Sequence, residues 1–149
     1  MSVQFIDPRG PRFGAGITSL ISLAAFAAAI GALANLSTAN VLMAALLVLF
    51  AWSVVAPKSQ PYQLIFRHLV RPRLKDPLEL EDPRPPQFAQ KVGLSFALLG
   101  GIGIALSSAE LVAIAAAFIF LAAFLNAFFG FCLGCQMYLL LKRAGLLGK

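Results

Sequence analysis

The sequence D-P-R-G-P-R-F at residues 7–13 returns half a chain later as D-P-R-P-P-Q-F at residues 82–88, and each copy precedes a long apolar stretch. A second echo follows each apolar region, with Y-Q-L-I-F-R at residues 62–67 and Y-L-L-L-K-R at residues 138–143. These pairs predict two tandem copies of one unit: a proline-rich start, a helical hairpin and an interfacial segment. Two spans per unit give both copies the same orientation in a membrane.

The composition requires these spans to lie in a bilayer. Of the 149 residues, 60% are hydrophobic and 12% are charged, whereas soluble domains contain about 25% charged residues. A helix needs about 20 apolar residues to cross the hydrocarbon, where it must satisfy its own backbone. Four stretches are long enough, at residues 13–34, 38–56, 88–106 and 110–130. The sequence predicts an all-α integral membrane protein with four transmembrane helices.

We interpret residues 1–149 as a single four-helix membrane domain, divided into repeat one at about residues 7–71, a linker at about 72–81 and repeat two at about 82–143. The prolines and glycine of the N-terminal motif are expected to prevent a helix before about residue 12. Residues 62–71 have apolar side chains at roughly helical spacing, which predicts an interfacial helix. The glycines of the third span are expected to allow close packing of a neighbouring helix.

The basic residues predict the orientation. All twelve lysines and arginines lie on one side of the four spans, and neither hairpin turn contains one. By the positive-inside rule, both termini, the interfacial helix and the long loop face the cytoplasm. Because the net charge of +6 lies beside the spans, the expected partner is a bilayer with anionic headgroups and not nucleic acid.

The only two cysteines, Cys132 and Cys135, lie near the end of the fourth span. A straight helix over residues 110–141 would be about 48 Å long at 1.5 Å per residue, whereas the hydrocarbon core is about 30 Å thick. The helix is therefore expected to bend or break at Gly130 and Gly134. Alanine at both glycines is expected to straighten and stabilise the segment.

The repeat predicts the same break independently. Aligning Tyr62 with Tyr138 sets Pro57, which ends the second span, opposite Leu133 in the cysteine segment. The cysteines are therefore expected at the cytoplasmic membrane surface, beside a helix break.

Two thiols three residues apart on a helix share one face, with Cβ atoms about 5–6 Å apart. This spacing suits disulfide exchange, and a helix break beside Cys132 would favour its thiolate. We expect Cys132 to attack and Cys135 to resolve, and we expect the cytosol to keep the pair reduced. The alternative is packing alone, with both cysteines inert.

Other candidate sites are few. A zinc site needs four ligands, and the lone histidine, His68, lies in a basic run, so we expect no bound metal and no cofactor. Asn126 is the one strongly polar residue inside the fourth span and is expected to bond a neighbouring helix. The sequence contains no Ser/His/Asp set, phosphate loop, H-E-x-x-H motif or intramembrane carboxylate relay. Whether the protein is an enzyme stays open.

The motif D-P-R-x-P-x-F and the segment G-F-C-L-G-C-Q-M-Y at residues 130–138 resemble a family of small bacterial membrane proteins, common in actinobacteria and catalogued as domain of unknown function 4395. The resemblance covers nearly the whole chain. It implies a bacterial plasma (inner) membrane location, with Cys132 and Cys135 as the hallmark pair. Members are described near thioredoxin-like and sulfurtransferase proteins, which implies thiol or sulfur chemistry.

Three functions follow as alternatives. The first is thiol redox or sulfur transfer with a soluble thioredoxin-like or rhodanese-like partner. The second is a small transporter or channel for a sulfur species or soft metal, for which the short chain favours a homo-oligomer. The third is a non-catalytic structural subunit of a membrane complex.

Overall fold

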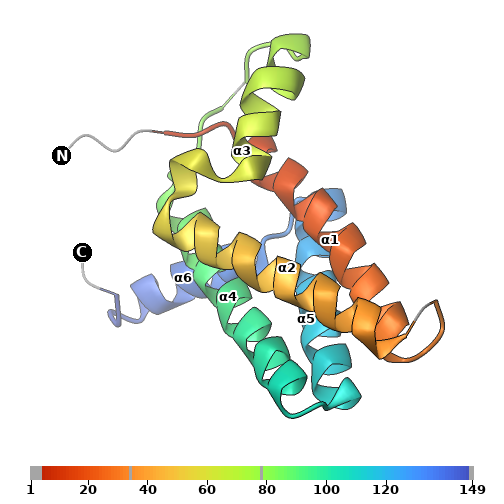
Figure 1. Cartoon of the computed structure of the whole chain (residues 1–149). Helices are drawn as coiled ribbons and strands as arrows, with labels where there is room; N and C mark the ends of the chain where they lie inside the picture. The colour runs from red at the N-terminus through yellow and green to blue at the C-terminus, as the bar shows by residue number, and fades with distance from the viewer. Residues whose placement is uncertain (1–4, 34, 78, 148–149) are drawn as a thin grey trace.

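The computed structural model describes residues 5–33, 35–77 and 79–147, and the described chain is mostly helical (Figure 1). In chain order the helices are α1 (Arg9–Ala29), α2 (Leu36–Val55), η1 (Pro57–Ser59), α3 (Pro61–Ile65), η2 (Phe66–Val70), η3 (Arg71–Arg73), α4 (Arg84–Ala105), α5 (Ala109–Phe129) and α6 (Leu133–Arg143). Within these described residues, four helices are long and apolar enough to cross a membrane: α1, α2, α4 and α5. The expected all-α class and four spans are confirmed.

The D-P-R motifs start the first helix of each hairpin. The expectation of no helix before residue 12 is wrong, because α1 begins at Arg9. The first four N–H groups of a helix have no intrahelical partner, so proline is tolerated there. The Asp7 carboxylate accepts a hydrogen bond from the Arg9 N–H at 2.9 Å, and Asp82 accepts one from the Arg84 N–H at the same distance. Each aspartate also forms a salt bridge with the same arginine.

The expected interfacial helix at residues 62–71 is divided among three connected helical segments. These are α3, the π-helical segment η2 and the 3₁₀ segment η3. Beyond them, the described part of the linker is not helical, and Glu81 exchanges two backbone hydrogen bonds of 2.9 Å with Ile6. Three positions named by the sequence predictions lie outside the described residues: Ala34 at the end of the first span, residue 78 of the linker and the basic residue Lys149.

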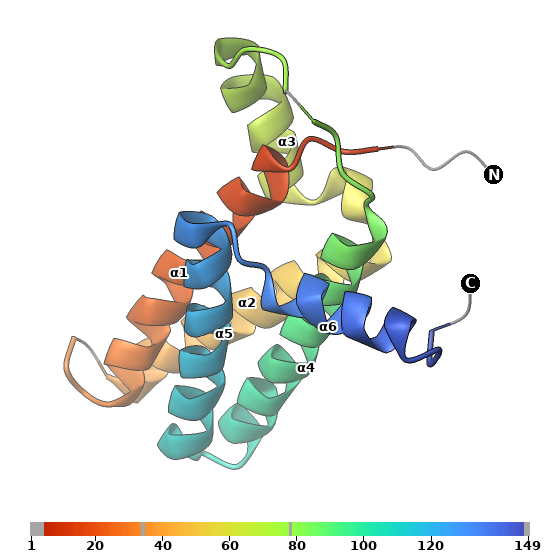
Figure 2. The ribbon, with the colours of Figure 1, turned by 180° about the vertical axis from the view of Figure 1, so that it is seen from behind.

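The two hairpins pack against each other through alternate helices. Helix α1 packs most extensively against α5, while α4 packs against both α5 and α2. In Figures 1 and 2, both hairpin turns lie at one end of the bundle, and the N-terminal segment and α3 lie at the other. Figure 2 also shows that α6 leaves the bundle sideways, across the N-terminal part of α4.

Small residues bring the helices together. The buried core cluster consists of Ala25, Ala28, Ala39, Met43, Leu46, Ala97, Val112, Ala115, Ala116 and Ile119. A Cβ atom placed on Gly93 would overlap the ring of Phe50, and one placed on Gly100 would overlap the side chain of Met43. The expected close packing at the glycines of the third span is therefore confirmed, with α2 as the neighbour of Gly93 and Gly100 and α5 as the neighbour of Gly103.

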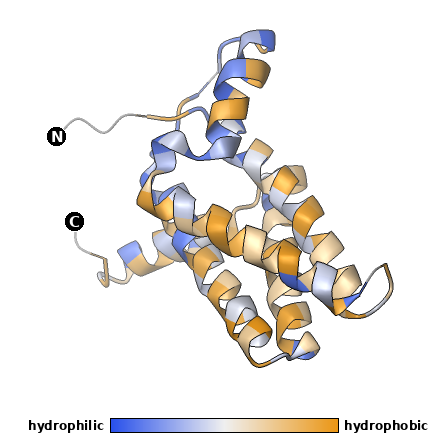
Figure 3. Cartoon of the chain, in the orientation of Figure 1, coloured by the Kyte–Doolittle hydropathy of each residue, from blue (hydrophilic) through white to orange (hydrophobic). Residues whose placement is uncertain are grey.

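Many large apolar side chains are exposed on the outside of the bundle, and hydrophobic residues occur along all four long helices (Figure 3). Leu20 on α1 is 70% exposed, Val41 on α2 is 66% exposed and Leu121 on α5 is 53% exposed. Monomeric soluble proteins rarely expose large contiguous apolar surfaces. The outer surface is therefore suited to contact with lipid chains.

Candidate functional site

The chain breaks between α5 and α6, within the segment where the sequence predicts a bend. Helix α5 ends at Phe129, and Gly130 follows with a φ of 65°. This left-handed conformation is favourable for glycine and ends many helices. The N–H groups of Gly130 and Phe131 both donate to the Leu125 carbonyl, which closes the end of α5. Helix α6 begins three residues later and points in a new direction.

Cys132 is the N-cap residue of α6. Its sulfur accepts a hydrogen bond from the Cys135 N–H at 3.2 Å. The same sulfur forms a disulfide with Cys135, across a Cα–Cα distance of 5.1 Å. The structure therefore differs from the expectation of a reduced pair. The physical reason is local: the extended N-cap backbone and the first helical turn bring both sulfur atoms together.

Gly134 belongs to the first turn of α6 and is buried. A Cβ atom placed on it would lie 2.5 Å from both Cα and Cβ of Ala89 on α4. The missing side chain lets the two helices touch at the backbone. Whereas Gly130 lies at the break itself, Gly134 serves this contact.

The other predicted site residues lie in different surroundings. Pro57 begins η1 after the end of α2, and both Pro57 and Asn126 line the same large cavity as Cys132. Gly130, Cys135 and His68 do not line that cavity. In the part of the chain that the structure describes, no group of three or more His, Cys, Asp or Glu side chains could hold a metal ion.

The cavity has a volume of about 1080 Å³ and lies between the two repeats. Its deep wall is apolar and includes Leu46, Phe96 and Phe118, which lie near the middle of α2, α4 and α5. Its charged lining residues lie outside the spans and are Asp7, Lys58, Arg67 and Arg71. The cavity therefore changes from charged to apolar along its depth.

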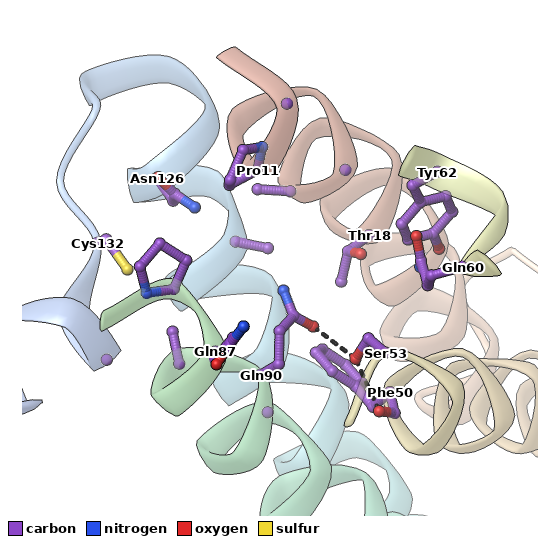
Figure 4. Close-up of a pocket in the computed structure, with 18 of the residues that line it drawn as sticks. Pro11, Thr18, Phe50, Ser53, Gln60, Tyr62, Gln87, Gln90, Asn126 and Cys132 are labelled. Carbon is purple, nitrogen blue, oxygen red and sulfur yellow. Dashed lines mark hydrogen bonds between the residues drawn. The ribbon is translucent and has the colours of Figure 1, made fainter. Parts of the chain in front are cut away.

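Uncharged polar groups also line the cavity, and Figure 4 labels several of them. They include the carboxamides of Gln60, Gln87, Gln90 and Asn126 and the hydroxyls of Thr18 and Ser53. Ser53 on α2 donates to the Gln90 side-chain carbonyl on α4 at 3.0 Å, which links the two repeats. Sequence reasoning found only Asn126 of this set. The sequence signal for Gln87 and Gln90 was their spacing of one helical turn at the start of an apolar span.

Tyr62 lies on the opposite side of the cavity from Cys132 in Figure 4. Its hydroxyl is buried and has no hydrogen-bond partner. Burial raises the pKa of Tyr62, and the neighbouring Thr18 hydroxyl lowers it in part. The two hydroxyls nevertheless do not have the geometry of a hydrogen bond. The phenol is therefore a neutral donor that is free to bond a guest in the cavity.

Gln60 occupies the place in repeat one that Cys132 occupies in repeat two. Gln60 is the N-cap of α3, and its side-chain oxygen accepts a hydrogen bond from the Gln63 N–H at 3.2 Å. This bond repeats the one between Cys135 and Cys132 in type and length. A glutamine pair and a cysteine pair therefore occupy equivalent positions of the two repeats.

The aromatic contacts support this correspondence. The ring of Phe13 lies 5.9 Å from that of Phe66, and the ring of Phe88 lies 5.7 Å from that of Tyr138. Tyr138 thus corresponds to Phe66, and the alignment of Tyr62 with Tyr138 predicted from sequence is not the structural one. More residues separate α1 from α2 than α4 from α5, which shifts the register after the first hairpin turn.

Comparison with known proteins identifies one family. No curated protein and no solved structure shows a significant match to the chain. The family model described as "Domain of unknown function (DUF4395)" matches residues 6–143. This range contains both hairpins, α6 and the two cysteines. The chain therefore belongs to the DUF4395 family.

Proposed function

We propose that this protein is a membrane-embedded thiol–disulfide component that exchanges electrons or sulfur with a soluble thioredoxin-like or rhodanese-like partner. The observation that carries the proposal is the disulfide at the N-terminus of α6, with Cys132 lining a large cavity. A helix N-terminus stabilises a thiolate, because its N–H groups and dipole favour negative charge. Reduction of this disulfide would leave such a thiolate on Cys132.

The exchange needs only the two cysteines and the partner. A thiolate of the partner attacks the Cys132 sulfur, the bond to Cys135 breaks, and Cys135 leaves as a thiolate. The second thiol of the partner then attacks the mixed disulfide and releases Cys132. The reverse sequence has Cys132 attack an oxidised partner and Cys135 resolve the mixed disulfide. Both directions pass through a mixed disulfide on Cys132.

We also propose that the membrane is the bacterial plasma membrane, with both termini in the cytoplasm. All twelve basic residues of the sequence lie outside the hairpin turns, which supports this orientation through the positive-inside rule. The exchange site then faces soluble cytoplasmic partners and anionic headgroups.

The test is alkylation in inside-out vesicles with a membrane-impermeant maleimide, after mild reduction and across a pH series. We expect rapid labelling of Cys132 with an apparent pKa below the free-thiol value of about 8.5. Cys135→Ser should trap a mixed disulfide with a soluble partner, whereas Cys132→Ser should not. If both thiols resist labelling until the bilayer is dissolved, they only pack, and a structural subunit becomes the better description.

A passage for a sulfur species or soft metal is the second candidate, favoured by the cavity that Cys132 lines. Toward the hairpin turns, however, the buried cluster of Met43, Leu46 and Ile119 fills the centre of the bundle. Transport through one chain would require these side chains to move. Sulfur-species uptake by sealed vesicles that is lost in Cys132→Ser would favour this function over exchange.

A further inference from the structure

The cavity extends far beyond what a soluble partner can reach. Cys132 lines it near the end of the spans, whereas Phe96 and Phe118 line it near the middle of α4 and α5. A folded protein in the cytoplasm can meet the disulfide but cannot enter the hydrocarbon depth of the bundle. A guest that reaches the deep wall must therefore be a small molecule, and the apolar residues of that wall favour one with apolar surface.

We infer that this cavity binds a lipid-soluble quinone, and that the quinone oxidises the Cys132–Cys135 dithiol. The inference rests on the proposed function, because it names the second electron partner of the same cysteine pair. A quinone is flat, apolar and soluble in lipid, and it accepts two electrons and two protons. These are the properties that the cavity and the dithiol together require.

The deep wall suits a flat ring. The rings of Phe96 and Phe118 are stacked, with centroids 5.2 Å apart and planes inclined by 14°, and Phe50 lines the cavity from α2. Aromatic faces of this kind pack well against a planar ring. The deep wall carries no charged side chain, so it favours an uncharged guest over an anion, whose charge would lose its hydration there.

The uncharged polar side chains that line the cavity offer hydrogen-bond donors to the carbonyl oxygens of a quinone ring. The Ser53 hydroxyl lies 2.7 Å from the Phe50 carbonyl and 3.0 Å from the Gln90 side-chain oxygen. The Gln90 amide nitrogen, on the other branch of that side chain, can donate to a guest. Gln60 is 5% exposed, and its oxygen is engaged by the Gln63 N–H. The buried Tyr62 hydroxyl, on the far side of the cavity, has no partner of its own. These groups donate without adding a charge.

The dithiol and the quinone together account for all the electrons and protons of the reaction. The thiols of Cys132 and Cys135 lose two electrons and two protons as the S–S bond forms. The quinone gains the two electrons, and its two carbonyl oxygens gain the two protons to give a quinol. A soluble dithiol can then reduce the new disulfide, so that electrons pass from a cytoplasmic dithiol to the membrane quinone pool.

The test uses the full-length protein in lipid nanodiscs, reduced, freed of reductant and kept without oxygen. The probe is a short-chain benzoquinone with a fully substituted ring, so that thiols cannot add to it. We expect one quinol for each disulfide formed, and none from the double variant Cys132→Ser, Cys135→Ser. Gln90→Leu should slow quinol formation at least tenfold, whereas Gln136→Leu, an exposed glutamine of α6 outside the cavity, should not change it.

The outcomes separate the two proposals. If the disulfide exchanges with a reduced thioredoxin-like protein but the dithiol yields no quinol, the quinone inference is overturned and the proposed function stands. Equal rates for the Gln90 and Gln136 variants would also overturn the inference, because oxidation would then occur outside the cavity. If the cysteines react with neither partner, both proposals fail.

Discussion

Alanine at position 134 should destabilise the protein, which reverses the expectation from sequence alone. Gly134 packs against Ala89, and an added Cβ would lie 2.5 Å from two carbon atoms of α4, one of them backbone. Comfortable carbon–carbon separations are about 3.5–4.0 Å, so α6 would have to move away from α4 by about 1 Å.

The size of the effect follows from two opposing contributions. Overpacking of a tight contact costs about 1–3 kcal/mol. Alanine also has a better helix propensity than glycine, by about 0.8–1.0 kcal/mol in a helix interior and by less in a first turn. We therefore expect Gly134→Ala to lower the free energy of unfolding by about 1–2 kcal/mol, a factor of about 5–30 in the folded-to-unfolded ratio.

The assay is reversible unfolding in mixed micelles, with Gly16→Ala as the control. Gly16 lies in α1, and a Cβ there would meet only Ala127, at an ordinary 3.9 Å, so this variant should match the wild type or exceed it slightly. Gly130→Ala should also lose about 1 kcal/mol, through its positive φ and not through a clash. A Gly134→Ala protein as stable as the wild type would refute the backbone contact between α4 and α6.

Three further predictions follow from the two repeats and their orientation. Hydrogen bonds from the arginine two residues later lower the carboxyl pKa of both Asp7 and Asp82. The stability that these carboxylates add is therefore present at pH values above their ordinary pKa of 3.8, and it is lost as the pH falls through their lowered pKa values. The double variant Asp7→Asn, Asp82→Asn should therefore lose less unfolding free energy than the wild type on acidification. Reporter fusions at the C-terminus and within residues 76–81 should both give cytoplasmic signals, and an external signal from either would refute the topology. The double variant Gln60→Cys, Gln63→Cys should form a second disulfide on oxidation, because these positions correspond to Cys132 and Cys135. The disulfide would be measured as two further thiols protected from alkylation, and thiols that stay free would refute the correspondence.

The four spans could be predicted from the sequence because the hydropathy of a span depends only on consecutive residues. Each span has about the length needed to cross a bilayer, and each ends at a turn or helix stop that is visible in the residues. The break at Gly130 was predictable because a longer straight helix could not fit the hydrocarbon. Helix starts were harder, since Pro8 and Pro11 look like helix breakers until the Asp7 hydrogen bond to the backbone is known.

The cavity depends on distant contacts that a single sequence does not record. In the sequence, Gln90 looks like an ordinary polar residue near a membrane surface. Only the packing of α4 on α2 brings it within hydrogen-bond distance of Ser53. Tyr62 was visible as a repeated motif, but its motif aligned to the wrong partner. The register between the repeats changes at the first hairpin turn, and one sequence without coordinates gives no measure of that change.

The short helices α3 and α6 differ in how they contact the first helix of their own hairpin. Tyr62 and Gly134 each follow the N-cap by two residues, so they occupy equivalent positions. In repeat one the bulky side chain belongs to α3, and Tyr62 packs against Gly14 of α1. In repeat two the small residue belongs to α6, so its backbone reaches Ala89. The first turn of α6, which carries Cys135, therefore packs against α4, the helix that also supplies Gln90, while the Tyr62 phenol lies on the opposite side of the cavity from Cys132. The two hairpins thus enclose a cavity with Cys132 on one side and the Tyr62 hydroxyl on the other, an arrangement that the proposed quinone would use.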